Sequence, residues 1–199
     1  MDRIRTGGRP VLALAILALA AAAGCERPVE QGERGAPAGS ANANGAAEAI
    51  VELKPIDKAG FDKLLAESDA PVVLVDYWGY WCPACMQKFP HTVEFHEKYA
   101  GRGLKVVSLA IEDKPDETRD AALEFLTKQG ATFANYIADA KYEDLEAASK
   151  AFDVGPFPTY RLFRKGGALI ANFELGEGHE EIEAAIKKAL DEQPAAGHE

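Results

Sequence analysis

The chain has 199 residues and a formal net charge of −10, and 47% of its residues are hydrophobic. Because an acidic surface repels the nucleic-acid backbone, we expect no nucleic acid among its partners. Residues 50–193 have the length and the apolar content of one domain with a single core, and no internal repeat divides them.

The first 24 residues have the pattern of an export signal. Arg3, Arg5 and Arg9 precede an apolar run at residues 11–23. This run is too short to cross a bilayer as a helix, but it suits the core of a signal peptide. We therefore expect an extracytoplasmic protein of the bacterial cell envelope, a compartment in which disulfides persist.

The end of the predicted signal peptide is open to two interpretations. Ala22-Ala23-Gly24-Cys25 resembles a bacterial lipobox, in which cleavage precedes a cysteine that is then acylated. That resemblance implies that Cys25 carries a lipid anchor to the membrane. The alternative is ordinary cleavage near residues 21–24, which would leave Cys25 as a thiol able to pair between chains.

Two low-complexity segments flank the predicted domain. Residues 25–49 are rich in Ala, Gly, Pro, Asn and Glu and almost free of large apolar side chains, so they predict a flexible tether. We expect residues 194–199 to form a disordered tail. The predicted organisation is thus a signal peptide at 1–24, a tether at 25–49, a domain at 50–193 and the tail.

The first elements of the domain lead to a pair of cysteines. Residues 50–53 can form a short strand, and Asp57 can cap a helix in which Phe61 and Leu65 recur at helical spacing. The aliphatic run at residues 72–75 predicts a central strand covered on both faces.

Cys82 and Cys85 follow this strand in the sequence Trp81-Cys82-Pro83-Ala84-Cys85. Pro83 suits the first turn of a helix, which places Cys82 at the N-cap and Cys85 one turn later. The helix dipole and the free N–H groups then stabilise a thiolate at Cys82 and lower its pKa. The pattern predicts a dithiol/disulfide site in which Cys82 attacks and Cys85, pointing inward, resolves.

Two other uses of the cysteine pair are less favourable. A zinc site needs four ligands, and outside the pair only Cys25 and four scattered histidines remain. A structural disulfide across so short a loop constrains the unfolded chain very little. We therefore expect the Cys82–Cys85 disulfide to be the redox group, with no metal and no other cofactor.

The remaining elements alternate between helices and strands. They are a helix at 82–99 with Pro90 in its interior, a buried strand at 104–111, a helix at 116–129, a short strand at 132–137, a helix at 142–152, a hairpin of strands at 159–163 and 169–173, and a final helix at 179–190. This order implies an α/β fold in which helices flank both faces of a mixed central sheet.

Several stretches of the domain carry a family resemblance. The segment Val75-Asp76-Tyr77-Trp78-Gly79-Tyr80-Trp81-Cys82, the helix residue Pro90 and the triplet Phe157-Pro158-Thr159 resemble the redox helix and the cis-proline loop of the thioredoxin superfamily. The resemblance covers essentially all of residues 50–190 and implies a thioredoxin-like fold. The segment 122–152 resembles the helix and strand inserted before the cis-proline loop in TlpA/ResA-like membrane-anchored thiol-disulfide oxidoreductases.

The resemblance implies roles for individual residues. Asp76 corresponds to the buried acid beneath the disulfide, where burial raises the pKa and lets the carboxylate accept the proton of Cys85. A solvated aspartate near the strand end is the alternative. The residues expected to contact the substrate are Trp81, Pro83, Ala84, Phe157 and Pro158.

Two further points follow from the same resemblance. A cis Pro158 would place the backbone of Phe157 beside the sulfurs, where an extended substrate segment can add as a strand. The lysine that the family often has on the neighbouring strand has no counterpart within residues 106–111. The charged partner of Asp76 is therefore left open.

These features predict an extracytoplasmic enzyme that reduces disulfides of exported proteins, such as cytochrome c maturation substrates. We expect the protein to be a monomer. We also expect a membrane electron donor to re-reduce it, because a dithiol in an oxidising compartment needs a source of electrons. The same residues working in reverse would make an oxidase or isomerase. A non-enzymatic module that carries a metal or senses redox state is the alternative from another class.

Overall fold

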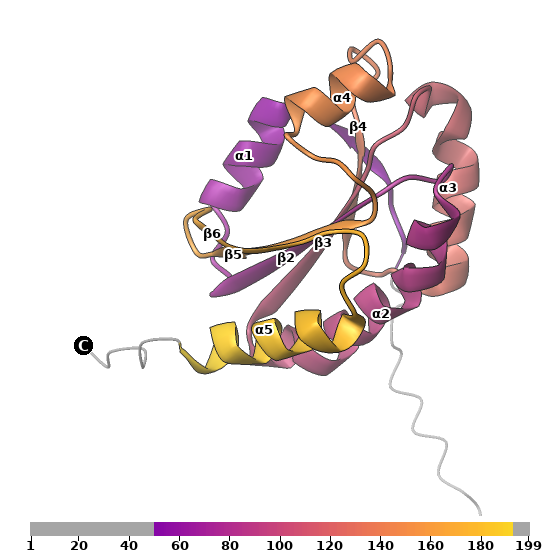
Figure 1. Cartoon of the computed structure of the whole chain (residues 1–199). Coiled ribbons are helices and arrows are strands. Elements are labelled where there is room, and N and C mark those ends of the chain that lie inside the picture. Colours follow the sequence, from indigo (N-terminus) through magenta and orange to yellow (C-terminus); the bar gives the residue numbers. More distant parts are fainter. Residues whose placement is uncertain (1–49, 193–199) are drawn as a thin grey trace, which may run out of the picture. The chain divides into compact units, whose positions relative to one another are not determined.

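The computed structural model describes residues 50–192 (Figure 1). Its six strands are β1 (Lys54–Ile56), β2 (Val72–Trp78), β3 (Leu104–Ala110), β4 (Ala134–Ala138), β5 (Thr159–Arg164) and β6 (Leu169–Phe173). They form one sheet in the order β1-β4-β3-β2-β5-β6. Strands β1 to β4 pair with one another in parallel, whereas β5 is antiparallel to both of its neighbours, β2 and β6. The predicted mixed sheet is therefore confirmed.

Helices cover both faces of this sheet (Figure 1). The helices are α1 (Lys58–Ala66), α2 (Pro83–Tyr99), α3 (Pro115–Gln129), α4 (Leu145–Ala151) and α5 (His179–Asp191), with a short 3-10 helix η1 (Ala100–Arg102) after α2. Side chains of α1 and α4 share one buried cluster, while α2 packs with α5 and with α3 on the opposite face. Within residues 50–192, no helix is both long and apolar enough to cross a bilayer.

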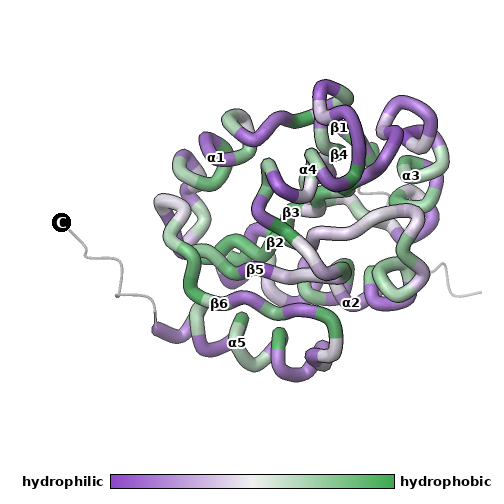
Figure 2. The backbone as a smooth tube through the Cα atoms, turned by 45° about the horizontal axis from the view of Figure 1, so that its top comes forward, coloured by the Kyte–Doolittle hydropathy of each residue, from purple (hydrophilic) through white to green (hydrophobic). Residues whose placement is uncertain are grey.

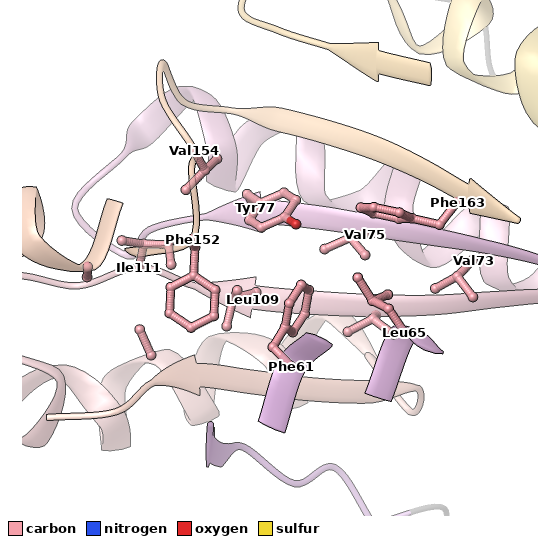
Figure 3. Close-up of a cluster of buried hydrophobic side chains, with 13 residues drawn as sticks. Phe61, Leu65, Val73, Val75, Tyr77, Leu109, Ile111, Phe152, Val154 and Phe163 are labelled. Atoms are coloured by element: carbon pink, nitrogen blue, oxygen red, sulfur yellow. The ribbon is translucent and has the colours of Figure 1, made fainter. Parts of the chain in front are cut away.

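Strand β2 is at the centre of the core, and all seven of its residues are buried. Successive side chains of a strand point to opposite faces of the sheet. Val73, Val75 and Tyr77 therefore share one face, and they pack in the cluster that includes side chains of α1 and α4. Figure 3 shows Phe61 and Phe152 in this cluster. The ring of Phe61 lies 6.0 Å from that of Tyr77 and 5.7 Å from that of Phe152, both edge to face. This packing holds β2 rigidly beneath the segment that carries the cysteines.

The helices bury one side each. In α5 the buried residues Ile182, Ile186, Ala189 and Leu190 recur at helical spacing. Figure 2 shows the corresponding alternation of hydrophobic and hydrophilic residues along α5. Such helices cover the sheet on one side and present polar residues to water on the other.

Two predicted elements begin three or more residues away from where the sequence placed them. The strand expected at residues 50–53 is found at 54–56, because Leu53 is buried among core side chains while β1 pairs with β4. The helix expected at 142–152 begins at Leu145, because the Asp144 carboxylate accepts the N–H of Ala147 at 2.8 Å and caps it there. The predicted signal peptide, Cys25, the tether and the tail lie outside the described residues.

Candidate active site

The cysteine pair lies where the chain passes from β2 into α2. Cys82 is the N-cap residue of α2, with extended backbone, and Pro83 occupies the first turn. Cys82 and Cys85 form a disulfide with their Cα atoms 5.3 Å apart. The Cys85 N–H donates to the Cys82 Sγ atom at 3.2 Å. An N–H group of the first helical turn therefore points at the sulfur, as the sequence predicts.

The two sulfur-bearing residues differ in accessibility. Cys82 is 5% exposed and Cys85 is 1% exposed. A thiolate that attacks a disulfide must reach one of its sulfurs along the S–S axis, and the larger exposed fraction of Cys82 makes it the more open of the two to such an approach. Since the N–H of Cys85 and the helix dipole favour negative charge at Cys82, the same sulfur is the better thiolate after reduction.

Asp76 is a buried carboxyl on β2 and is 1% exposed. The hydroxyl of Thr92 donates to its Oδ2 atom at 2.6 Å, while its Oδ1 atom has no hydrogen-bond partner within the described part of the chain. Burial raises the pKa of Asp76 to about 7, and the Thr92 hydrogen bond and the charge of Lys88 oppose this rise. This burial rules out a solvated aspartate. A carboxylate of this pKa can take up and release a proton near neutral pH.

The charge that acts on Asp76 comes from Lys88, but among the described residues no direct ion pair joins the two side chains. Lys88 of α2 lowers the pKa of Asp76 through its charge, and its ammonium group donates to the carbonyl oxygen of Glu177 at 2.8 Å. Lys88 and Thr92 lie three and seven residues after Cys85, a spacing that places them on one side of a helix. This helical spacing is the signal that could have identified them.

Removal of the Thr92 hydroxyl tests this account of Asp76. We expect Thr92→Val, which keeps the shape of the side chain, to raise the pKa of Asp76 by about one unit, because the lost hydrogen bond stabilises the ionised form. The measurement is an NMR titration of the Asp76 carboxyl carbon. The control is Thr127→Val on the exposed side of α3. If the pKa of Asp76 is unchanged or lower in Thr92→Val, the Thr92 hydroxyl does not stabilise the ionised carboxylate.

An apolar rim lies next to the cysteines. Trp81 is 45% exposed, and its ring meets that of Phe157 edge to face at 5.4 Å. Phe157 and Ala84 pack against the buried cluster that contains both cysteines. Trp78, in contrast, is completely buried and belongs to the core. Trp81 and Phe157 therefore form the aromatic part of this rim, and the neighbouring Tyr80 is also exposed, at 37%.

The loop before β5 has the predicted proline geometry. The Phe157–Pro158 peptide bond is cis, as the resemblance implies, and the Gly155–Pro156 bond is also cis, which the sequence analysis did not predict. The hydroxyl of Thr159 donates to the carbonyl oxygen of Pro156 and closes the loop. Pro158 is buried while Pro83 is exposed at the start of α2.

Sequence reasoning missed two contacts from the loop after β3. The indole N–H of Trp81 donates to the carbonyl oxygen of Ile111 at 2.9 Å, and the Tyr80 N–H donates to the Glu112 carboxylate at 2.5 Å. The available signal was positional, because β2 and β3 are parallel and their carboxyl ends meet at one edge of the sheet.

The histidines of α2 do not form a metal site. His91 stacks on His179 with ring centres 4.1 Å apart, and His96 packs against Phe133. Burial lowers the pKa of His96. In the part of the chain that the structure covers, no three His, Cys, Asp or Glu side chains are grouped to hold a metal ion.

Comparison with known proteins agrees with this geometry. The family model described as Redoxin matches residues 52–190. The thiol-disulfide oxidoreductase ResA of Bacillus thuringiensis (strain Al Hakam) is 28% identical over 116 residues, which are 58% of this chain and 62% of ResA. ResA of Bacillus subtilis (strain 168) is 26% identical over 98 residues, which are 49% of this chain and 50% of that protein. The matches thus span less than two thirds of the length of these relatives.

Solved structures show the same fold. The putative thiol:disulfide interchange protein DsbE from Chlorobium tepidum is 27% identical with a TM-score of 0.50, covering 61% of this chain and 81% of that one. A thioredoxin-like protein solved in its oxidised form has a TM-score of 0.55 at 21% identity, covering 70% and 86% of the two chains. The fold predicted from the sequence is thereby confirmed.

Proposed function

Because this chain belongs to the Redoxin family and is a thioredoxin-like protein similar to ResA, we propose that it is a thiol-disulfide oxidoreductase whose redox group is the Cys82–Cys85 pair. The observation that carries the proposal is the disulfide at the N-terminus of α2, with the Cys85 N–H directed at the Cys82 sulfur. This arrangement stabilises a thiolate on the more accessible of the two cysteines.

Reduction of a substrate proceeds by two exchanges. The Cys82 thiolate attacks one sulfur of the substrate disulfide, forming a mixed disulfide while the other substrate sulfur leaves as a thiolate. Cys85 loses its proton and attacks the Cys82 sulfur, which re-forms the Cys82–Cys85 bond and expels the second substrate thiolate. Two electrons pass from the protein dithiol to the substrate. A reductant that supplies two electrons and two protons must then restore the dithiol.

Asp76 serves the second exchange in this proposal. Cys85 is the more deeply buried cysteine, so its thiol needs a nearby base to become a thiolate. With its pKa raised to about 7 by burial, Asp76 holds a proton in part of the population and accepts one in the rest. Its unpartnered Oδ1 atom is the free acceptor.

Substrate docks on the apolar rim and the cis-proline loop. Trp81, Pro83, Ala84 and Phe157 contact the segment that contains the substrate cysteine, while the backbone beside Pro158 pairs with it as an added strand. The exposed ring of Trp81 supports this assignment. A partly apolar rim beside buried sulfurs suits a protein substrate better than a small polar thiol.

The proposal also covers the location of the protein and the direction of electron flow. Residues 1–24 act as an export signal, Cys25 carries the lipid anchor and residues 25–49 tether the domain at 50–193 to a membrane. The protein acts as a monomer outside the cytoplasm and takes electrons from a membrane donor. It reduces exported proteins, with cytochrome c maturation substrates as the leading class. The Arg-rich start, the apolar run and the Ala-Ala-Gly-Cys sequence support this setting.

The reduction potential of the Cys82–Cys85 pair tests the direction of electron flow. We expect a midpoint near the thioredoxin value of about −270 mV, measured in glutathione or dithiothreitol buffers by alkylation and mass. Thioredoxin itself serves as the reference protein in the same buffers. A value near about −120 mV would instead identify an oxidant and overturn the assignment as a reductase.

A further inference from the structure

The segment between β2 and the redox helix is held by the loop that follows β3. This segment, Gly79–Trp81, connects Trp78 at the end of β2 to the N-cap residue Cys82. Its internal hydrogen bond runs from the Cys82 N–H to the Gly79 carbonyl oxygen at 3.0 Å. The position of the Cys82 sulfur therefore depends on how this short turn is fixed.

Two groups of the β3 loop fix the turn from outside. The carbonyl oxygen of Ile111 accepts the indole N–H of Trp81 at 2.9 Å. The indole lies so close to Gly79 that a Cβ atom there would be 2.4 Å from the Trp81 Nε1 atom. The Glu112 carboxylate accepts the Tyr80 N–H at 2.5 Å. The turn is thus held at its backbone and at its aromatic side chain.

Glu112 is an unusual residue to find in this position. It is 2% exposed, and burial raises its pKa while the hydrogen bonds from Tyr80 and Thr118 oppose the rise. Burying a carboxylate costs free energy that an apolar side chain would not cost. A carboxyl group buried at such a cost, and bonded to the backbone two residues before Cys82, points to a role in the redox centre.

We propose that Glu112 is a positioning residue of the redox centre, because its carboxylate oxygen accepts the Tyr80 N–H and so fixes the turn that places Cys82 at the N-cap of α2. This inference rests on the proposed thiol-disulfide exchange. The Cys85 N–H stabilises a Cys82 thiolate only while the sulfur stays at the helix N-terminus. Release of the turn lets Cys82 move from that position, and its thiol pKa rises.

The proposal assigns the effect to the hydrogen-bond acceptor and not to the negative charge. Glu112→Gln keeps an oxygen of the same reach and removes the charge. Glu112→Ala removes the acceptor, and Glu112→Asp keeps the charge but shortens the side chain by one methylene. The control is Glu117→Ala, whose carboxylate lies on the exposed side of α3 and pairs with Lys114.

The test is the pH dependence of Cys82 alkylation in the reduced full chain, followed by mass spectrometry. We expect Glu112→Gln and Glu117→Ala to react within about twofold of the unchanged protein at pH 7. We expect Glu112→Ala and Glu112→Asp to show a Cys82 pKa raised by about one unit and, below that pKa, alkylation about tenfold slower. If Glu112→Ala does not fold, Glu112→Asp decides.

Two outcomes overturn the proposal. One is an unchanged Cys82 pKa in folded Glu112→Ala or Glu112→Asp. The other is a change in Glu112→Gln as large as in Glu112→Ala, which would assign the effect to charge. Insulin reduction by the unchanged protein tests the exchange activity separately, so loss of that activity and failure of the positioning role are distinguishable.

Discussion

Replacement of Cys82 by alanine is expected to abolish disulfide exchange, with a loss of at least about a thousandfold in the rate of insulin reduction. Cys82 is the more exposed of the two cysteines and the one at which the Cys85 N–H is directed, so we expect the mixed disulfide to form there. Cys85→Ala is expected to fail differently. Its Cys82 thiolate still attacks, but nothing resolves the product, and mixed disulfides with protein substrates accumulate.

The two variants are compared by the turbidity of reduced insulin and by mass spectrometry of trapped complexes. The control is Cys25→Ala, which removes the third cysteine of the chain and should reduce insulin at the unchanged rate. Turnover that persists in Cys82→Ala, or mixed disulfides that form through Cys85 instead, would contradict the assignment of Cys82 as the attacking residue.

The redox helix was predictable because its determinants are local in the sequence. An apolar strand, a cysteine before a proline and a second cysteine three residues later are enough to place Cys82 at the N-cap of α2. The order of the elements followed from hydrophobic periodicity in the same way. The bounds were less predictable at Leu53, since an apolar residue can be buried by packing as well as by strand pairing.

The surroundings of the site depend on contacts between distant residues. The oxygen of Glu112 that holds Tyr80 belongs to a loop 32 residues further along the chain. Lys88, whose charge lowers the pKa of Asp76, is held by the carbonyl oxygen of Glu177, 89 residues away. Periodicity identifies elements but does not specify which side chains of two elements meet, so these partners needed the assembled fold.

Asp76→Asn is expected to make the protein more stable at alkaline pH. The pKa of Asp76 is raised from 3.8 to about 7 by burial, so between these values the folded state binds a proton that the unfolded state has lost. The free energy of unfolding therefore falls as the pH rises through this window. The difference of about three pKa units corresponds to about 4 kcal/mol of stability, which is present in full below about pH 4 and is lost as the pH rises to about 7.

An asparagine cannot ionise, so Asp76→Asn removes this penalty and keeps the acceptor for Thr92. Denaturant unfolding of the oxidised protein at pH 4 and pH 8 measures the effect. The variant's gain over the unchanged protein should be about 4 kcal/mol larger at pH 8 than at pH 4, whereas Asp120→Asn, at an exposed site on α3, should give no such difference. Because Glu112 also has a raised pKa and is present in every protein compared, its contribution cancels.

A gain independent of pH would mean that Asp76 does not titrate in this range, and the base for Cys85 would have to be another group. If the gain does depend on pH, slower release of mixed disulfides by Asp76→Asn near pH 7 would show that one carboxyl both lowers stability and serves the exchange.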